Sequence, residues 1–474
     1  MTSARPFYVA GEPAAGSGEL VVRDKFRDAV HAAVQRPTSA DRDRALATAF
    51  AARGAAASVP AFERERILRQ LADGVAEGRA AFVATLIAEA GKPRKFAELE
   101  VARTLDTLLE SARQAAAAGA GSYLPLDQTE RGAGHRALWR RVPRGVVACI
   151  TPFNFPLNLV AHKIGPAIAA GCPFVLKPAS LTPLSALLLG DLLATTAWPA
   201  AAWSILPLPG ADSEPLASDP RTAVLSFTGS ADVGWRLRAA TARAHVVLEL
   251  GGNAAVIVHG DADLADAATR IAAAAFAQAG QSCISVQRIF VERPALEPFR
   301  AALLAATGRL SVGDPADPRT DVGPMIAEPE ARRVESWIAE AVAGGARLLC
   351  GGRRDRALLS PTLLENARAA DKVSCHEVFG PVATLTPYDT FDQALALAND
   401  SRFGLQAGLF TRDLLRAWRA YDALEVGGVI VNGPPAFRAE NMPYGGVKES
   451  GLGREGVRFA IEDYTEIKTL VFRD

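Results

Sequence analysis

The chain has 474 residues, 49% of them apolar and 22% charged, and its 52 basic residues are balanced by 52 acidic ones. These fractions are close to globular averages and exclude a disordered or fibrous protein. A zero net charge gives no basic field for nucleic acid and no polybasic patch for a membrane, so we expect a small-molecule partner. At roughly 100–200 residues per domain, the length allows two to four domains.

The sequence contains no evident targeting or membrane-spanning segment. Residues 1–18 lack an apolar core of signal-peptide length, and the most apolar stretch, 184–208, is interrupted by Asp191 and Pro199. Five cysteines form no CxxC pair, which is typical of reduced thiols. The six histidines have no HxxxH or HxxEH spacing. We therefore expect a cytoplasmic protein without a metal site.

The first half of the chain alternates helical and strand-like segments. Residues 62–118 have the spacing of amphipathic helices, with a break near Gly91, Lys92 and Pro93. From residue 145, short apolar runs typical of buried parallel strands are mostly followed by Ala- and Leu-rich helical segments. These runs lie at residues 145–150, 173–178, 223–229, 245–252, 254–260 and 288–292. The alternation predicts a doubly wound α/β sheet.

The second half repeats this alternation and therefore predicts a second α/β domain. Its strand-like runs lie at residues 362–367, 383–388, 407–410 and 427–433. Two segments fit neither domain: residues 121–142 have the pattern of a two-stranded ribbon around a Gly-rich turn, and residues 464–473 that of one more strand. Because an isolated hairpin is only marginally stable, we expect these segments to join across subunits. An edge sheet within one chain is the alternative.

One cysteine stands in a loop of small residues. The tetrapeptide Gly280-Gln281-Ser282-Cys283 follows an Ala-rich helical run, so we expect the thiol to be accessible and able to form a thiolate. A thiolate is a nucleophile that adds to a carbonyl carbon. For any one of the five cysteines, an inert buried thiol is the alternative.

Two polar side chains follow strand-like runs. Glu249 ends one run and precedes Gly251 and Gly252, which is typical of a carboxylate that points into the ligand crevice of an open α/β sheet. Asn154 follows the run 145–150, and its amide can donate a hydrogen bond to an oxyanion. A surface ion pair or helix cap for Glu249, and a turn-shaping role for Asn154, are the alternatives.

Two further motifs indicate an anion site. Lys177 and Ser180 lie at and just after the end of the run 173–178, and residues 227–234 combine a strand end with a GSxxxG segment and the start of a helix. In that arrangement the amides of the helix N-terminus face an anion, and glycine permits close contact. The segment is not the GxGxxG fingerprint, and a single GxxxxG often arises by chance.

In their order along the chain, these motifs resemble those of the aldehyde dehydrogenase superfamily, from about residue 20 to the end, and further matches lie at residues 377–382, 442–448 and 450–456. The resemblance implies the aldehyde dehydrogenase fold: a Rossmann-like cofactor domain, a catalytic domain, both doubly wound α/β, and a β-ribbon that links subunits into homodimers or homotetramers. It implies a cofactor domain at 1–120 and 143–250 with a helix at 446–462 packing back on it, a catalytic domain at 251–445, and a ribbon at 121–142 and 463–474.

The resemblance also implies a role for each motif. Cys283 would attack an aldehyde, and the Asn154 amide with the Cys283 backbone N–H would hold the oxyanion. After hydride passes to the nicotinamide, Glu249 would activate the water that releases the acid, with Lys163 and Glu455 on its proton route. The cofactor, NAD or NADP, would contact Ile150, Thr151, Pro152, Phe153, Lys177, Ser180, Gly210, Gly229, Ser230, Gly234, Leu250, Gly251, Glu377 and Phe379.

Two departures bear on specificity. Ser180 stands where many NAD-dependent members have a glutamate that would repel a 2′-phosphate, so we expect NADP to be accepted as well as NAD. The chain looks closest to the branch with lactaldehyde, glyceraldehyde-phosphate and phosphonoacetaldehyde dehydrogenases. There, Arg103 and Arg438 would bind an anion, and Phe155 and Ser282 would face the substrate, which predicts a small carboxylated or hydroxylated aldehyde or a broader apolar range. Surface ion pairs are the alternative for both arginines.

Three other functions compete with this interpretation. A CoA-acylating dehydrogenase shares the fold, the cysteine and the asparagine but commonly lacks the base, so Glu249 favours hydrolysis. A non-redox thiol hydrolase would use Cys283 with His376 or Glu249 as its base, but would not need the cofactor motifs. A binding or structural protein without activity would not need Cys283, Glu249 and Asn154 together.

Overall fold

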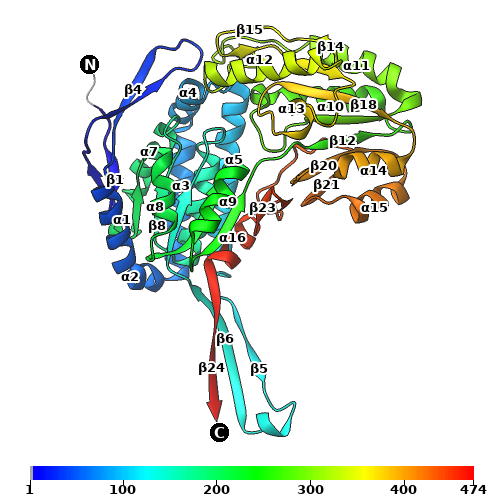
Figure 1. Cartoon of the computed structure of the whole chain (residues 1–474). Helices are drawn as coiled ribbons and strands as arrows, with labels where there is room; N and C mark the ends of the chain where they lie inside the picture. Colours follow the sequence, from blue (N-terminus) through cyan, green and yellow to red (C-terminus); the bar gives the residue numbers. More distant parts are fainter. Residues whose placement is uncertain (1–3, 474) are drawn as a thin grey trace.

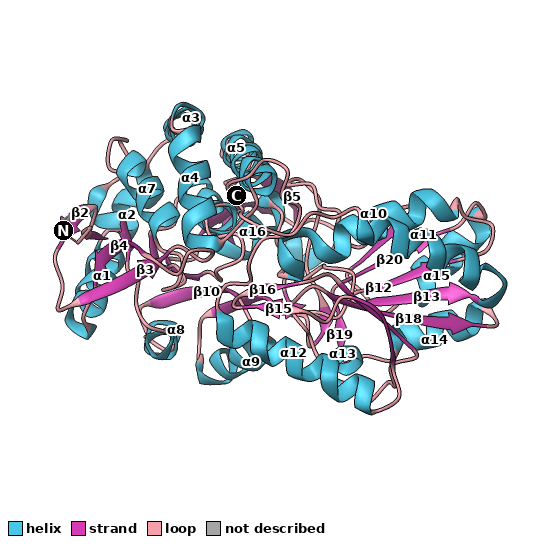
Figure 2. Cartoon of the chain, turned by 90° about the horizontal axis from the view of Figure 1, so that it is seen from above, coloured by secondary structure: helices cyan, strands magenta, loops and turns pink. Residues whose placement is uncertain are grey.

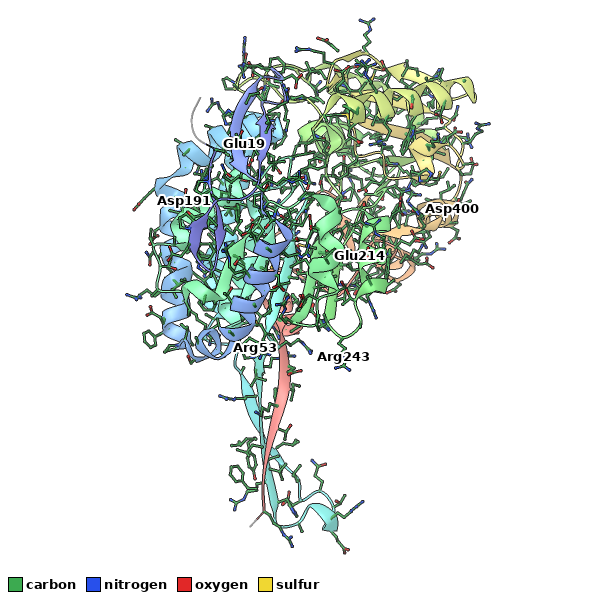
Figure 3. All side chains as sticks on the ribbon, turned by 60° about the vertical axis from the view of Figure 1, so that its left-hand side comes forward. Glu19, Arg53, Asp191, Glu214, Arg243 and Asp400 are labelled. Atoms are coloured by element: carbon green, nitrogen blue, oxygen red, sulfur yellow. The ribbon has the colours of Figure 1, made fainter. Side chains whose placement is uncertain are left out.

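The computed structural model describes residues 4–473 of the chain. Figure 1 shows two α/β bodies side by side and a long ribbon of strands that projects away from both. Charged side chains of both signs lie on the outside, such as Arg53, Glu214 and Arg243 in Figure 3. Within the described residues, no helix is both long and apolar enough to cross a membrane.

The first body is built on an eight-stranded sheet whose five central strands are parallel. Every residue of β7 is buried, which explains its unbroken apolar sequence VVACI. In sheet order the strands are β2 (Glu12–Ala14), β1 (Phe7–Val9), β9 (Trp203–Ile205), β8 (Phe174–Lys177), β7 (Val146–Ile150), β10 (Thr222–Thr228), β11 (His245–Glu249) and β23 (Gly451–Leu452). The predicted runs 145–150, 173–178, 223–229 and 245–252 are therefore confirmed as strands of this sheet, whereas the runs 254–260 and 288–292 belong to the second sheet.

Helices cover both faces of this sheet. The predicted helical region and its break are confirmed as α3 (Ala61–Glu77), α4 (Arg79–Ala90) and α5 (Arg94–Gln114). All thirteen residues of α6 (Asn158–Ala170) are buried, since α3 and α5 pack over it. The remaining helices include α1 (Ser39–Ala51), α2 (Arg53–Ser58), α7 (Leu184–Leu193), α8 (Ser213–Ala217) and α9 (Ala231–Ala240). Strands β1 to β4, including the hairpin of β3 (Glu19–Arg23) and β4 (Val30–Gln35), were not predicted.

The second body is built on a seven-stranded sheet that is parallel except for its edge strand β14. In order, the strands are β14 (Arg347–Cys350), β17 (Thr362–Glu365), β18 (Val382–Tyr388), β13 (Arg288–Glu292), β12 (Ala255–Val258), β20 (Gln406–Phe410) and β21 (Gly428–Val431). Helices lie on both sides of it (Figure 2), namely α10 (Leu264–Phe276), α11 (Leu296–Gly308) and α12 (Glu328–Ala343) with one core, and α14 (Phe391–Asn399) and α15 (Leu414–Ala423) with another. The second predicted α/β sheet is confirmed.

The connection between the two sheets positions the site. Strand β11 ends at Glu249 and β12 begins at Ala255, so only residues 250–254 separate the last parallel strand of one sheet from a central strand of the other. This short link brings the C-terminal edge of the first sheet against the N-terminal edge of the second. The main cavity lies between these two edges, because loops from both contribute to its wall.

The ribbon is a three-stranded antiparallel sheet within one chain. Strands β5 (Gly121–Pro125) and β6 (His135–Pro143) form the predicted hairpin, and β24 (Thr465–Arg473) pairs with β6 along its whole length. The two segments thus pair with each other inside the chain, which is the alternative to joining across subunits. Seven large apolar side chains of the ribbon remain exposed: Tyr123, Leu124, Leu138, Ile467, Leu470, Val471 and Phe472.

The expected helix at 446–462 is wrong in its first half. That region begins with β22 (Val447–Lys448) and β23, and the helix α16 spans only Val457–Tyr464. Gly453 and Gly456 have φ angles of 81° and 96°, a left-handed conformation that interrupts a helix. The helix that does form packs against α6 and α5, on the first body as expected.

Candidate active site

A cavity of about 480 Å³ lies between the two bodies and collects most of the predicted site residues. Loops from both sheets line it, so residues far apart in the sequence face one another. The predicted residues in its wall are Arg103, Pro152, Phe153, Asn154, Phe155, Gly229, Ser230, Glu249, Leu250, Gly251, Ser282, Cys283, Glu377, Phe379, Arg438 and Glu455.

The other predicted residues lie outside the cavity wall. Five are at or near the ends of strands or on the helices behind the cavity: Ile150, Thr151, Lys163, Lys177 and Gly234. Ser180 is half-buried in the loop after β8, and Gly210 is exposed at the start of a short 3-10 turn. A phosphate-ribose chain extends well beyond a nicotinamide pocket, so positions outside this wall remain compatible with the predicted cofactor roles.

Cys283 lies in a loop between α10 and β13. Before it, Gln278 and Ala279 have φ angles of 52° and 55°, which for residues with a Cβ is a costly left-handed conformation. The thiol Sγ is 3.0 Å from the hydroxyl oxygen of Tyr444. Burial raises the pKa of the Cys283 thiol to about 11, although Tyr444 acts in the opposite direction. The thiol is therefore protonated at neutral pH in the free protein and needs a base to become a nucleophile.

The Asn154 loop is tied directly to the Cys283 loop. Asn154 Nδ2 donates to the backbone oxygen of Gln281 at 2.9 Å, and the backbone oxygen of Asn154 accepts from the Gln278 amide. One hydrogen on Nδ2 remains available, since an amide nitrogen carries two. Asn154 thus sits where a donor to an oxyanion is needed, and the same contacts fix its distance from the cysteine loop.

Glu249 ends β11 as a buried carboxyl group. Neither of its oxygens has a hydrogen-bond partner within residues 4–473. Burial first, and then the negative charge of Glu455, raise the pKa of Glu249 well above its ordinary value. A Cβ at Gly445 would come within 2.9 Å of a Glu249 oxygen, so glycine there leaves room for this side chain. An unpaired carboxyl with a raised pKa in a cavity has the properties of a general base.

Behind Glu249, a second carboxylate is held by cations. Lys163, from α6, donates to Glu455 at 3.2 Å and to the Ser226 hydroxyl at 3.0 Å. Arg438 also donates to Glu455, at 3.0 Å. Although burial would raise it, Lys163 and Arg438 lower the pKa of Glu455 to about 2. The pKa values of the two carboxyl groups are therefore shifted in opposite directions, which suits a proton route.

The residues around β10 and α9 fit a dinucleotide. Ser230 precedes α9 without a side-chain cap, which leaves the first amides of the helix available to an anion. A Cβ at Gly251 would lie 2.0 Å from a Glu377 oxygen and one at Gly234 would lie 2.4 Å from Leu250, so neither position accepts a side chain without movement. Glycine at these two positions permits the close approach of these segments.

Lys177 and two aromatic rings complete the cofactor side. Lys177 is buried at the end of β8, and its side chain makes no hydrogen bond within the described chain. Burial lowers the pKa of Lys177 to about 8. The Phe153 and Phe379 rings meet edge to face, with centroids 5.6 Å apart. A buried cation without a partner indicates a site for a polar or anionic ligand.

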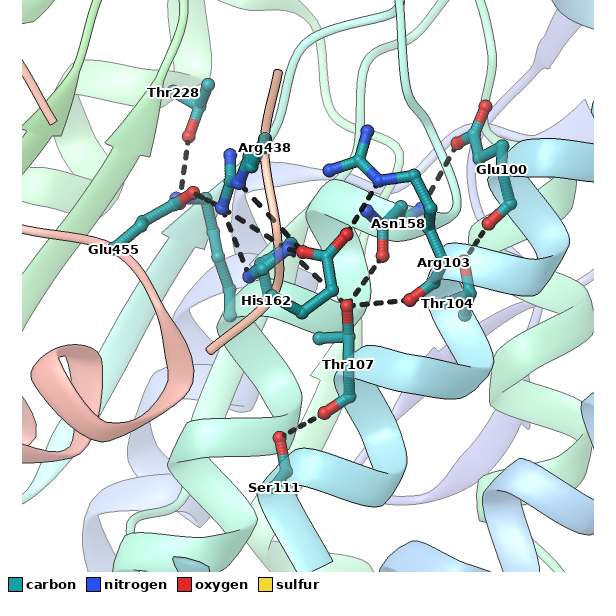
Figure 4. Close-up of polar contacts among 12 residues, drawn as sticks. Glu100, Arg103, Thr104, Thr107, Ser111, Asn158, His162, Thr228, Arg438 and Glu455 are labelled. Carbon is teal, nitrogen blue, oxygen red and sulfur yellow. Dashed lines mark hydrogen bonds and ion pairs between the residues drawn. The ribbon is translucent and has the colours of Figure 1, made fainter. Parts of the chain in front are cut away.

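Arg103 and Arg438 both line the cavity and both form ion pairs, and their binding of a substrate anion stays a prediction. Arg103 Nε donates to Glu440 at 2.6 Å, and the Arg438 guanidinium lies 4.0 Å from the centroid of the Tyr444 ring. Figure 4 shows Arg103 on α5 facing the His162 and Arg438 group. The Phe155 ring is close to two cations, with Lys92 Nζ 4.1 Å and Arg103 Cζ 5.8 Å from its centroid.

Several residues of the site were not predicted. Tyr444 lay within a recognised motif, but nothing in the sequence placed its hydroxyl at the thiol. Glu440 and His162, which join the two arginines, gave no signal at all, since they meet only through the fold. Conversely, His376 is not in the cavity wall, and its ring packs against Trp337 with centroids 5.6 Å apart. His376 is therefore not placed to act as a base for Cys283.

Comparisons with known proteins agree with this architecture. The family model described as "Aldehyde dehydrogenase family" matches residues 13–470. The 3-sulfolactaldehyde dehydrogenase of Priestia aryabhattai is 42% identical over 465 residues, which cover 98% of this chain and 97% of that protein.

Two solved structures share the fold over nearly the whole chain. Aldehyde dehydrogenase 21 from Physcomitrella patens, in complex with the reaction product succinate, has a TM-score of 0.98 at 41% identity, covering 100% of this chain and 99% of that one. The NADP-dependent glyceraldehyde-3-phosphate dehydrogenase from Bacillus halodurans, complexed with NADP, has a TM-score of 0.96 at 32% identity and covers 99% of each.

Proposed function

Because this chain belongs to the aldehyde dehydrogenase family, and so oxidises aldehydes with NAD or NADP, we propose that its substrate is a small anionic aldehyde, released as the free acid. The observation that carries the chemistry is the convergence of Cys283, Asn154 and Glu249 on one cavity from three different loops. A nucleophile, an oxyanion donor and a base around one space are what acyl transfer to water requires.

The protein's own residues carry the covalent steps. The Cys283 thiol loses its proton to solvent water, and its Sγ adds to the aldehyde carbon, while the carbonyl electrons move onto oxygen. The Asn154 amide and the Cys283 backbone N–H donate to that oxyanion. When bound, the nicotinamide accepts the hydride of the resulting thiohemiacetal, which leaves a thioester on Cys283. Glu249 then takes a proton from water, whose oxygen adds to the thioester, and Sγ departs as the acid is released.

The cofactor is held by residues of both bodies. Lys177 would bind the adenosine ribose, Ser230 and the start of α9 would hold the pyrophosphate, and Glu377 with Phe379 would hold the nicotinamide ribose. Ser180 presents no negative charge to a 2′-phosphate, so NADP is accepted as well as NAD. The remaining contacts come from Ile150, Thr151, Pro152, Phe153, Gly210, Gly229, Gly234, Leu250 and Gly251.

The substrate side binds an anion through Arg103 and Arg438, with Phe155 and Ser282 in the same wall. The similar proteins named for sulfolactaldehyde and crystallised with succinate handle molecules with an anionic end, which supports this assignment. The test is a panel of neutral, carboxylated, sulfonated and phosphorylated aldehydes, scored by formation of reduced nicotinamide with each cofactor. Equal kcat/KM for neutral and anionic aldehydes of the same length would contradict the substrate class.

Free acid rather than acyl-CoA is the proposed product, because a buried Glu249 beside the thiol is suited to activating water. Adding CoA to the assay separates the two reactions. We expect the free acid in its presence and no acyl-CoA thioester by mass spectrometry. Accumulation of acyl-CoA would overturn the hydrolytic step.

The same proposal extends to assembly and location. A homodimer or homotetramer would cover the seven exposed apolar side chains of the ribbon, which a single chain leaves in water. A reducing compartment, the cytoplasm, would keep Cys283 reduced, and all five cysteines lack a disulfide. Light scattering coupled to gel filtration measures the assembly, and a monomeric mass would contradict it.

A further inference from the structure

Glu440 lies outside the cavity wall, next to the two arginines that line it, Arg103 and Arg438. Its carboxylate accepts from Arg103 Nε at 2.6 Å, faces the His162 ring nitrogen Nε2, and is 3.9 Å from Arg438 Nε. The side chain is 7% exposed, and it is not part of the cavity wall. It therefore reaches a substrate only through the arginines, which come from α5 and from the segment after β21.

His162 connects the same groups without adding charge. Burial first, and then Arg438, lower the pKa of His162 from its ordinary value, so the ring is neutral above about pH 6.5. Its Nε2 faces the Glu440 carboxylate, and Arg438 Nη2 lies 3.2 Å from Nε2 and 3.3 Å from Nδ1. The histidine thus fixes the positions of Arg438 and Glu440 relative to each other.

The charges around the substrate end of the cavity can now be counted. Arg103 and Arg438 contribute two positive charges, and Glu440 contributes one negative charge. Burial alone would raise the pKa of Glu440, but His162, Arg103 and Arg438 together hold it well below its ordinary value, so it stays ionised. The opposite charges of the adjoining ion pair, Lys163 and Glu455, cancel each other. The cluster formed by Arg103, Arg438, Lys163, Glu440 and Glu455 therefore has a single net positive charge.

We infer that Glu440 sets this charge and makes the site select aldehydes with a monoanionic end group, a carboxylate or a sulfonate, over those with a dianionic phosphate. The inference rests on the proposed binding of the substrate anion by Arg103 and Arg438. A monoanion neutralises the site, whereas a dianion leaves an uncompensated negative charge in a buried place beside Glu440 and Glu455. Glu440 is a specificity-determining residue that acts through its arginine partners.

A matched series of three substrates tests the inference on the unaltered enzyme. Glyceraldehyde is neutral, 3-sulfolactaldehyde is a monoanion at all assay pH values, and glyceraldehyde 3-phosphate changes from monoanion to dianion near a pKa of about 6. The kcat/KM for the phosphate, divided by that for the sulfonate, should fall more than about tenfold between about pH 5.5 and about pH 8. The ratio removes the pH dependence of the enzyme's own groups. A constant ratio would overturn the inference.

A variant tests the residue itself. In Glu440→Gln the net positive charge rises to two, so the phosphate-to-sulfonate ratio at about pH 8 should increase at least about tenfold relative to the parent enzyme. Values for each protein are divided by its kcat/KM for glyceraldehyde, which removes any general loss of activity. The matched control is Glu365→Gln, which removes a buried carboxylate paired with Arg300 and Arg347 on β17. The control should leave the ratio unchanged.

The outcomes distinguish two kinds of failure. If the parent enzyme prefers both charged aldehydes to glyceraldehyde but Glu440→Gln has the ratio of the control, Glu440 does not set the specificity. If the parent enzyme does not prefer the sulfonate to glyceraldehyde, the proposed anionic substrate class itself is wrong. Should the variant fail to fold, as judged by its circular dichroism spectrum, the pH series on the parent enzyme still decides the matter.

Discussion

The two sheets contribute to the site from opposite edges. In the first sheet, the side chains proposed to act in the site stand at or just after the C-terminal ends of parallel strands, as Lys177 and Glu249 do. In the second sheet they stand before the strands begin: Cys283 precedes β13, and Glu377 precedes β18. The rule that ligands bind at the carboxyl ends of strands therefore finds only half of this site.

The opposite edge of the second sheet, at the C-terminal ends of its strands, also carries titratable groups but does not line the cavity; we call it the unused edge. At the C-terminal ends of β12 and β20, His259 and Asp261 lie with Glu292 and Thr411 in a cluster of ion pairs and hydrogen bonds. None of these four residues lines the main cavity. Titratable groups at a strand end are thus not sufficient for a site, because the two sheets must also face each other across a space.

The largest expected loss of activity follows a substitution at the N-terminal edge of the second sheet. Cys283→Ala should lower aldehyde oxidation by at least about 10⁴-fold, because the covalent step has no other nucleophile. Formation of reduced nicotinamide at saturating aldehyde is the measurement. Titration of the cofactor by fluorescence should give an unchanged Kd, which separates loss of chemistry from loss of the fold. Retained oxidation would remove the second-sheet edge from the mechanism.

The next largest loss of activity is expected for a substitution at the C-terminal edge of the first sheet. Glu249→Gln should still produce a burst of reduced nicotinamide, while steady-state turnover falls by about 10²–10⁴-fold, since an amide cannot take a proton from water. Rapid mixing detects the burst, and quenched samples should contain the thioester. The burst should be slower at low pH, because less of Cys283 is then present as the thiolate. A normal steady-state rate would show that Glu249 is not the general base.

Cofactor choice is a smaller effect at the same edge. Ser180→Glu should shift the ratio of kcat/KM for NADP over NAD by about tenfold or more toward NAD, because a carboxylate there repels a 2′-phosphate. Ser180→Gln is the matched control of similar size without charge. If both variants shift the ratio equally, size rather than charge is responsible.

A still smaller change tests the contact between Tyr444 and the thiol. Because the Tyr444 hydroxyl lowers the Cys283 pKa against the effect of burial, Tyr444→Phe should move that pKa further above about 11. The rate of alkylation by iodoacetamide reports the thiolate. In the parent enzyme it should keep rising from about pH 8 to about pH 10, and in the variant it should be several-fold lower over that range. Identical profiles would show that the hydroxyl does not stabilise the thiolate.

The smallest effect is expected at the unused edge. His259→Gln removes a side chain 3.3 Å from both Asp261 and Glu292, outside the cavity. We expect kcat/KM within about twofold of the parent enzyme, as for most changes away from a site. A large loss of activity, with an unchanged thermal midpoint, would mean that this edge also takes part in function.

Much of the fold was predictable because strand periodicity is a local property. The buried runs that became β7 and β12 are apolar throughout, and those that became β8, β10 and β11 are mostly apolar, which indicates central parallel strands. The short β1 and β2 escaped prediction because they are three residues each and are held at the sheet edge by pairing, β1 with β9 and β2 with β1. The glycines after Tyr444 were misinterpreted as helix because their positive φ angles depend on tertiary contacts.

The features of the site likewise separate into those that the sequence determines and those that depend on the tertiary structure. The sequence by itself determined the chemical groups: a thiol in a loop of small residues, a carboxyl at a strand end, an amide after another strand and a helix start open to an anion. Only the tertiary structure decided their relations. Burial changed the pKa values of Cys283 and Glu249 in the same direction, and packing of α5 against α6 placed Arg103 and His162 around Glu440. Such contacts join residues hundreds of positions apart, so no local pattern encodes them.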